Sequence, residues 1–216
     1  TLFRSALLNY SKNFGQHGLK VMVGYHAEKY EVSKNQMQRN NFPSNSLNDM
    51  DAGGASTQTN DGLSRELAML SYFGRINYDF AGKYLLEANF RADASSRFAP
   101  GHRWGYFPSF SAGWVMSNES WMENTKNWMD FLKVRASWGQ NGNENIGAYK
   151  YASTYAFGDL GLYSFNNNKN GGTQGAYPSL LPNNEITWET SEQTNVGLDA
   201  RFLNGRLNAR SEEHTS

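Results

Sequence analysis

Strict alternation of apolar and polar residues is the feature that most constrains how this chain can fold. In residues 84–93, YLLEANFRAD, one alternate set is apolar: Tyr84, Leu86, Ala88 and Phe90. The other set is polar or charged apart from its first member: Leu85, Glu87, Asn89, Arg91 and Asp93. A period of two predicts a β-strand with two unlike faces. The apolar face could cover a soluble core or face lipid on a membrane barrel.

The composition fits an all-β protein and argues against several other classes. The 216 residues carry 20 basic and 20 acidic side chains, so nothing points to nucleic acid as a partner. Cysteine is absent, which excludes disulfides and thiol chemistry. No apolar run approaches the ~18 residues of a membrane helix. Mean hydropathy is −0.70, yet 14% of residues are aromatic and 21 are glycine, which suits a barrel that is apolar only at alternate positions.

Alternating segments fill most of the chain, and helical periodicity is nearly absent. They cover residues 2–12, 19–31, 67–79, 83–94, 106–116, 131–139 and 190–202, and a further one begins at 206. Short connections at 13–18, 80–82 and 204–205 alternate with long polar ones at 32–66, 95–105 and 140–189. The connection 117–130 belongs with the short set by position and is long enough for a helical turn.

This alternation of connections predicts that all long loops leave the same end of the sheet. Outer-membrane barrels have this asymmetry, with short periplasmic turns and long extracellular loops. The strand-like segment 148–157 is then a local hairpin within the excursion 140–189. Tyr78, Tyr84 and Phe202 lie on the apolar face beside short turns, where an interfacial aromatic girdle is expected. A soluble β-sandwich remains the alternative on alternation alone.

Turn chemistry predicts the registers of two hairpins. With 80–82 as a three-residue loop, the expected partners are Tyr78/Tyr84, Ile76/Leu86, Asp79/Lys83 and Arg75/Glu87. The last two pairs each join opposite charges. With Asn204-Gly205 as a two-residue turn, the expected partners are Phe202/Leu207, Ala200/Ala209 and Arg201/Asn208.

Three long stretches resemble the C-terminal barrel half of SusC/RagA-type TonB-dependent outer-membrane transporters of Bacteroidetes. They are SYFGRINYDFAGKYLLEANFRADASSRFAPGHRWGYFPSFSAGW at 71–114, DFLKVRASWGQNGNENIGAYKY at 130–151 and NNEITWETSEQTNVGLDARFLNGRL at 183–207. The resemblance covers residues 1–209 in order. It implies an antiparallel transmembrane β-barrel of about 22 strands around an N-terminal plug, of which this chain would supply about eight.

The resemblance also implies a function for the whole protein. The family imports large nutrients, such as oligosaccharides or peptides, with energy from the TonB complex, and a SusD-like surface lipoprotein closes over the barrel. The sequence shows no signal peptide, TonB box, plug or final strand ending in an aromatic residue, so we expect an inactive fragment. Arg75, Glu87, Arg91, Lys133 and Arg135 would line the inner wall, mainly as structural polar contacts.

Enzymatic chemistry finds no support in the sequence. The histidines, His17, His26, His102 and His214, are scattered without ligand spacing. NGNEN at 141–145 resembles the start of a calcium loop but lacks its Asp and bidentate Glu ligands. We therefore expect no catalytic residue, metal or cofactor.

Aromatic residues in the loops are the remaining candidates for substrate contact. Trp104, Trp188, Tyr163 and Tyr177 could stack on sugar rings, although packing of the loop bases is the better interpretation for the two tryptophans. Substrate choice more plausibly resides in 33–62 and 158–182, within which no substrate-binding residue can be named. A soluble carbohydrate-binding or adhesin sandwich and a self-contained small membrane barrel remain alternatives.

The last seven residues, RSEEHTS at 210–216, do not continue the strand pattern. They place Ser211, Glu213 and Thr215 on the outward face, where a charge toward lipid is unfavourable. One reading frame of a widely used sequencing adapter encodes the same heptapeptide. We therefore predict that 210–216 is a non-native tail without function and that it is disordered.

Overall fold

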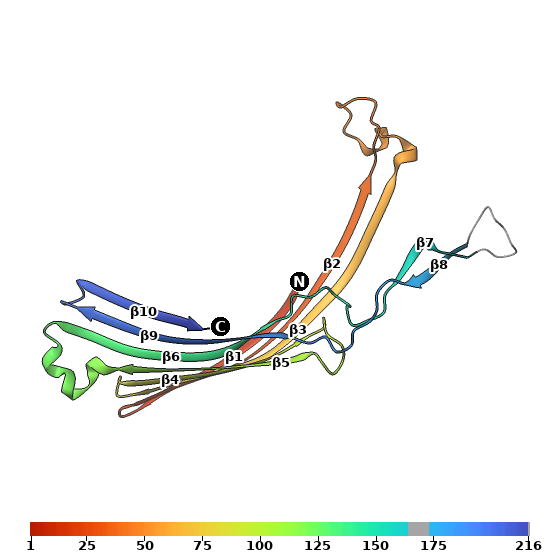
Figure 1. The fold of residues 1–216 in the computed structure, drawn as a ribbon. Helices are drawn as coiled ribbons and strands as arrows, with labels where there is room; N and C mark the ends of the chain where they lie inside the picture. The colour runs from red at the N-terminus through yellow and green to blue at the C-terminus, as the bar shows by residue number, and fades with distance from the viewer. Residues whose placement is uncertain (164–172, 216) are drawn as a thin grey trace.

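The computed structural model describes residues 1–163 and 173–215 and shows an all-β architecture (Figure 1). The strands are β1 Leu2–Phe14, β2 His17–Gln38, β3 Thr59–Phe80, β4 Tyr84–Ser95, β5 Trp104–Val115, β6 Met129–Asn143, β7 Tyr155–Tyr163, β8 Thr173–Pro178, β9 Glu189–Phe202 and β10 Leu207–Thr215. Short 3-10 segments lie at η1 Met50–Ala52, η2 Ala55–Thr57, η3 Met116–Asn118 and η4 Ser120–Thr125. The antiparallel prediction is confirmed in every pairing.

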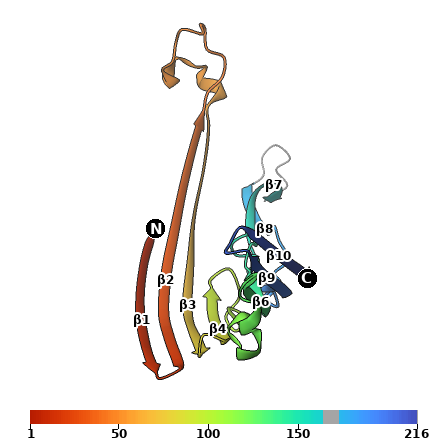
Figure 2. The same cartoon turned by 90° about the vertical axis from the view of Figure 1, so that its left-hand side faces the viewer.

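Eight strands form one curved sheet in the order β1-β2-β3-β4-β5-β6-β9-β10 (Figures 1 and 2). β1 and β10 lie at opposite edges, so the sheet is open. β7 and β8 form a separate hairpin. No second sheet covers either face of the eight strands, and few hydrophobic side chains among the described residues are buried. A sandwich core requires two packed sheets, so this part of the chain does not fold as the soluble sandwich.

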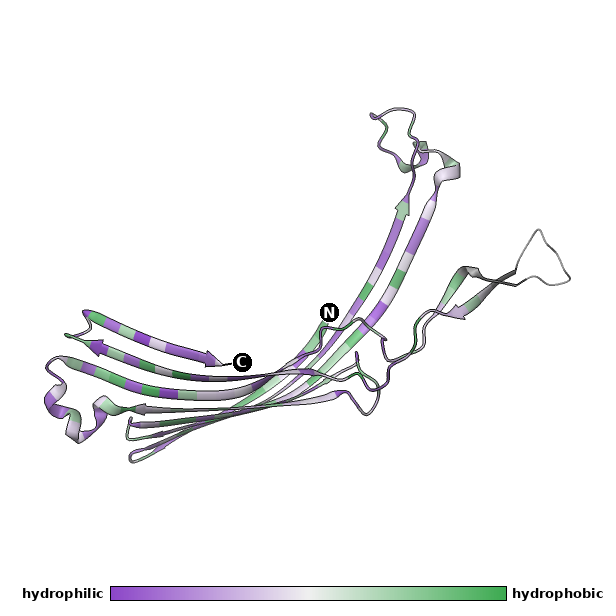
Figure 3. Cartoon of the chain, in the orientation of Figure 1, coloured by the Kyte–Doolittle hydropathy of each residue, from purple (hydrophilic) through white to green (hydrophobic). Residues whose placement is uncertain are grey.

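Apolar and polar residues alternate along the strands (Figure 3), so their side chains lie on opposite faces of the sheet, as predicted. One row across the outer face runs Leu19, Tyr78, Leu86, Ala112, Ala136 and Val196 through successive pairings. These residues belong to the apolar sets, and Leu86 and Val196 are more than half exposed. Charged and small polar residues occupy the intervening positions. An exposed apolar sheet face of this extent is unusual in water and typical of contact with lipid or protein.

The connections alternate between the two ends of the sheet as predicted, although 116–128 at the short end is longer than 96–103 at the other end. Residues 15–16, 81–83, 116–128 and 203–206 join strands at one end, whereas 39–58, 96–103 and 144–188 join them at the other. The connection 32–66 was expected to be a loop, but 22-residue strands occupy much of it, and β2 and β3 project beyond the rest of the sheet (Figure 2).

The local hairpin of the long excursion is also shifted from its expected place. Its first strand, β7, begins at Tyr155, whereas residues 149–151 form a turn. The predicted strand 148–157 is therefore correct only over its last three residues. The hairpin stands apart from the eight-stranded sheet, as expected (Figure 1).

The predicted register of the β3–β4 hairpin is wrong by two residues. Tyr84 pairs with Phe80, so β3 includes a residue that was expected in the loop, and Leu86 pairs with Tyr78. Ala81 and Gly82 adopt positive φ angles of 56° and 65° in the loop. Lys83 leaves its expected partner Asp79 and forms an ion pair with Glu119 at 2.9 Å. A two-residue shift keeps every side chain on its predicted face, so the assignment of faces is confirmed.

The β9–β10 hairpin has the predicted register. Phe202 pairs with Leu207 and Ala200 with Ala209. Asn204 and Gly205 have φ angles of 58° and 82°, as a type I′ turn requires at both central positions. The expectation of a disordered tail is wrong for residues 210–215, because β10 continues to Thr215 along β9. Its backbone can pair with β9 whatever its side chains are, since ladder hydrogen bonds use only main-chain groups.

Candidate functional site on the two faces of the sheet

Aromatic rings form a row on the outer face beside the short connections. The ring centroids of His17 and Phe80 are 4.8 Å apart, and Phe80 and Tyr84 follow at 6.3 Å. Tyr84 stacks on Trp114, also at 6.3 Å. Phe202, predicted for this row, stacks on Trp128 at 6.0 Å. Amphipathic rings at this level are characteristic of a membrane interface.

A second aromatic row crosses the outer face towards the long loops. Tyr72 packs against Tyr25 at 5.5 Å and stacks on Trp104 at 6.1 Å, while Phe90 stacks on Tyr106 at 6.3 Å. Trp104, interpreted as a residue that packs at a loop base, directly follows the 96–103 connection and packs on the outer face. Tyr106 and Trp114 are eight residues apart on β5, about 27 Å along the strand. With a tilt of ~40°, the rows lie roughly 20 Å apart in height, close to the ~25 Å apolar band of such barrels.

The inner face carries a polar trough of about 800 Å³. Its lining includes Lys20, Asn77, Asp79, Glu87, Lys133 and Arg135. Small residues such as Ser111 and Gly113 form its floor and leave room between the charged side chains. The trough therefore brings together three of the five predicted inner-wall residues, Glu87, Lys133 and Arg135.

The two other predicted inner-wall residues are held by polar neighbours on the same face. Arg75 Nε donates to Asn89 Oδ1 at 2.6 Å and lies 3.9 Å from Glu87. Arg91 forms a 2.6 Å ion pair with Asp93. Its guanidinium also donates to Ser71 and lies over the Phe73 ring, 5.6 Å from the ring centroid. These contacts fix both guanidinium groups against the wall.

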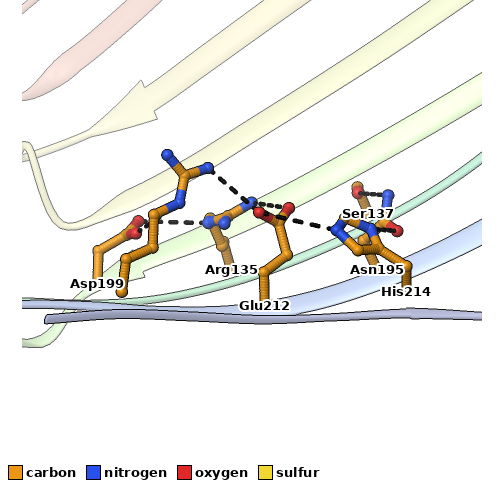
Figure 4. Close-up of polar contacts among 7 residues, drawn as sticks. Arg135, Ser137, Asn195, Asp199, Glu212 and His214 are labelled. Carbon is orange, nitrogen blue, oxygen red and sulfur yellow. Dashed lines mark hydrogen bonds and ion pairs between the residues drawn. The ribbon is translucent and has the colours of Figure 1, made fainter.

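Arg135 is the centre of a polar cluster towards the β10 edge of the inner face (Figure 4). Its Nε lies 3.3 Å from Asp199, and its guanidinium lies so close to Gly197 that a Cβ there would be 2.8 Å from Arg135 Cζ. Arg135 also pairs with Glu212, and Arg210 and His214 join the cluster. The last three residues belong to the predicted non-native tail. We therefore attribute only the Arg135–Asp199 pair to the inner face.

A small aromatic core joins the bases of two long loops. Phe98 is fully buried, and its ring lies 5.4 Å from that of Trp188, which contacts Phe107 at 5.3 Å. Trp188 Nε1 donates to the carbonyl of Arg103 at 2.8 Å. The preferred interpretation of Trp188 as loop packing agrees with this geometry. The sequence analysis missed Phe98 and Phe107; Gly142, whose Cβ would overlap the Phe107 ring, was the available signal.

The remaining sequence candidates do not form a site together. Among the described residues, no group of His, Cys, Asp and Glu could hold a metal ion, and no helix is long and apolar enough to cross a membrane. Asn143 is bonded to Glu189 within the β6–β9 ladder. Tyr177 is half-buried in β8. The side chain of Tyr163 and residues 164–172 lie outside the described part of the chain.

Comparison with known proteins agrees with this two-faced architecture. The family described as TonB dependent receptor-like, beta-barrel matches residues 3–211. TonB-dependent receptor P3 of Formosa agariphila is 31% identical over 213 residues, covering 96% of this chain and 20% of that protein. TonB-dependent receptor SusC of Bacteroides thetaiotaomicron is 32% identical over 214 residues, covering 93% of this chain and 19% of that protein.

A solved structure shares the fold. The RagAB peptide transporter superposes with a TM-score of 0.81 at 27% identity, covering 98% of this chain and 22% of the matched chain. The chain thus spans about a fifth of the length of the curated relatives it matches. Because the family match extends over nearly the whole sequence, the chain belongs to the TonB-dependent receptor β-barrel family, and it resembles the SusC and RagA members.

Proposed function

We propose that the whole protein imports large nutrients across the outer membrane with energy supplied through TonB. The described strands form part of the barrel wall, and the substrate is an oligosaccharide or a peptide. The observation that carries this proposal is the pair of unlike faces: apolar and aromatic outside, polar and hollowed inside. Lipid on one side and an aqueous lumen on the other satisfy both faces at once.

The inner wall suits a passage through which substrate moves rather than a site that binds substrate tightly. Some of its charged groups have partners of opposite sign, as in Arg75 with Glu87 and Arg135 with Asp199. Such pairs keep the wall polar without strongly favouring a substrate of either charge. The trough between them offers polar contacts for a plug domain and for water. On this proposal, the chain alone transports nothing, because plug and TonB contact lie elsewhere in the protein.

The long-loop end is the proposed side of substrate and lipoprotein contact. A solved relative is the RagAB peptide transporter, and a curated relative is named SusC. By analogy, we propose a SusD-like surface lipoprotein as the partner. Substrate choice is assigned to 33–62 and 158–182, because the described residues of both stretches belong to the long-loop end of the sheet. Residues 164–172 of the second stretch lie outside the described part of the chain.

Uptake by cells that carry the intact parent protein tests the proposal. Deleting the gene should abolish growth on at least one oligosaccharide or peptide source, and re-expression should restore it. Removing 158–182 alone should impair uptake or change substrate preference, while the barrel still reaches the outer membrane in folded form. Unaltered growth of the gene deletion on every such source would refute import as the function. Normal uptake after the loop deletion would remove only the specificity role of 158–182.

A further inference from the structure

The connection between β5 and β6 differs from the other connections at its end of the sheet. The other described connections there have two to four residues, whereas residues 116–128 contain η3 and η4. Backbone hydrogen bonds within it include Glu119 N to Met116 O at 3.0 Å and Met122 N to Glu119 O at 3.1 Å. Met122 is buried. The connection is thus an ordered element with its own backbone hydrogen bonds rather than an irregular loop.

Polar contacts fasten this element to neighbouring turns on both sides. Asn118 Nδ2 donates to the carbonyl of Gly82 at 2.8 Å, in the β3–β4 turn. On the other side, Leu203 N donates to the carbonyl of Trp128 at 3.0 Å, in the β9–β10 turn. These bonds hold the connection along the rim of the sheet.

Glu119 is the strongest of these attachments. Its carboxylate accepts hydrogen bonds from Lys83 at 2.9 Å, Tyr84 at 2.7 Å and Trp114 at 3.1 Å. Tyr84 and Trp114 belong to the aromatic row beside the short connections on the outer face, the lower aromatic row. The charge of Glu119 is therefore satisfied within the protein, and the connection is joined directly to that row.

Two tryptophans of the connection remain exposed next to this row. Trp121 is 58% exposed and meets Trp114 edge to face at 6.4 Å. Trp128 is 50% exposed and stacks on Phe202 at 6.0 Å. Both rings thus continue the aromatic row beyond the ends of the strands. Lys126, also exposed, lies between them in the sequence.

Tryptophan, with its apolar ring and one N–H donor, partitions to the boundary between lipid tails and headgroups. A lysine beside it can extend its ammonium to lipid phosphate. We propose that residues 116–128 form a surface anchor that rests in the phospholipid headgroup layer, with Trp121 and Trp128 as its contacts. The occupant is lipid because the exposed rings are continuous with the outer face. This inference rests on the proposed function, which places that face in the membrane.

Depth measurement by nitroxide labelling tests the anchor in the whole transporter. The protein, freed of any other cysteine, is reconstituted in phosphatidylethanolamine–phosphatidylglycerol nanodiscs and labelled at Asn124→Cys. Collision with oxygen and with a water-soluble nickel chelate reports depth. Controls are Leu86→Cys on the outer face and Met50→Cys in the long loop at 39–58. We expect position 124 to be intermediate between lipid-like 86 and water-like 50.

Each result separates the two proposals. If position 124 is as accessible to nickel as position 50 while 86 is lipid-like, the anchor is refuted and the membrane sheet stands. If position 86 is itself water-like, the membrane placement, and with it the proposed function, fails. Trp121→Ser with Trp128→Ser should move position 124 toward water, and Trp121→Tyr with Trp128→Tyr should restore its depth. No movement in the serine variant would also refute the anchor.

Discussion

A single arginine should destabilise the protein when it is placed on the outer face of the sheet but not when it is placed on the inner face. Ala88 lies on the outer face, paired with Ile76 and Phe110. It is four residues from Tyr84 in the lower aromatic row, about 13 Å along the strand and roughly 10 Å in height at a tilt of ~40°. Ala88 is therefore near the middle of the apolar band. Ser111, on the inner face, is one residue from Phe110 and so at nearly the same depth.

The magnitudes follow from these positions. Arginine near the midplane of the lipid face costs about 2–4 kcal/mol, which corresponds to roughly 30- to 1000-fold in the folding equilibrium. Ser111→Arg instead enters the trough opposite Glu87, its cross-strand partner. An opposite-charge cross-strand pair contributes about 0.2–1 kcal/mol, so the change should be close to neutral. Ala88→Arg should thus be destabilising and Ser111→Arg should not.

Denaturant unfolding of the whole transporter in lipid vesicles measures both variants against the unaltered protein. The free energies of unfolding, or the midpoints if unfolding is not reversible, should separate in the stated order. Equal destabilisation by the two arginines would show that depth, not face, controls the cost. A larger effect of Ser111→Arg would mean that the faces are inverted, and it would refute the lipid-facing assignment.

Three further predictions concern the rim, the loop bases and the chain end. Hydrogen bonds from Lys83, then from Tyr84 and Trp114, lower the pKa of Glu119 from 4.5 to about 2. The stability that the Glu119 carboxylate contributes should therefore be fully present above the unfolded pKa and lost as the pH falls to about 2. In thermal scans, the melting temperatures of Glu119→Gln and the unaltered transporter should converge near pH 2. Phe98→Ala should lower the free energy of unfolding by about 3–5 kcal/mol and raise the rate of amide hydrogen exchange in 96–103, whereas Phe42→Ala in another loop should not. An unchanged exchange rate in Phe98→Ala would contradict the shared aromatic core. Long-read sequencing of the locus should show another sequence in place of 210–216, and finding RSEEHTS in genomic DNA would refute the adapter origin.

The sequence by itself determined which face each strand presents and at which end the long connections lie. Alternation with a period of two assigns every residue of β4 to a face without reference to any partner. The order of the connections along the chain reveals their sides, because each antiparallel strand returns the chain to the opposite end. Both properties can be read from residues that are neighbours in the sequence, and the family resemblance rests on the same stretches. Alternation places Arg75, Glu87, Arg91, Lys133 and Arg135 on the polar face, and the family resemblance implied that this face is the inner wall.

Register and long-range packing were decided only by the tertiary structure. A shift of two residues leaves the alternation unchanged, so sequence pattern cannot distinguish Tyr84 opposite Tyr78 from Tyr84 opposite Phe80. The observed register is accompanied by stacking of Phe80 on Tyr84 and by the contact of Lys83 with Glu119, a residue 36 positions away. Phe98 and Trp188 meet for the same reason: their contact exists only after distant strands have placed both loop bases side by side. Alternation specifies faces, whereas non-local partners select among the registers that those faces allow.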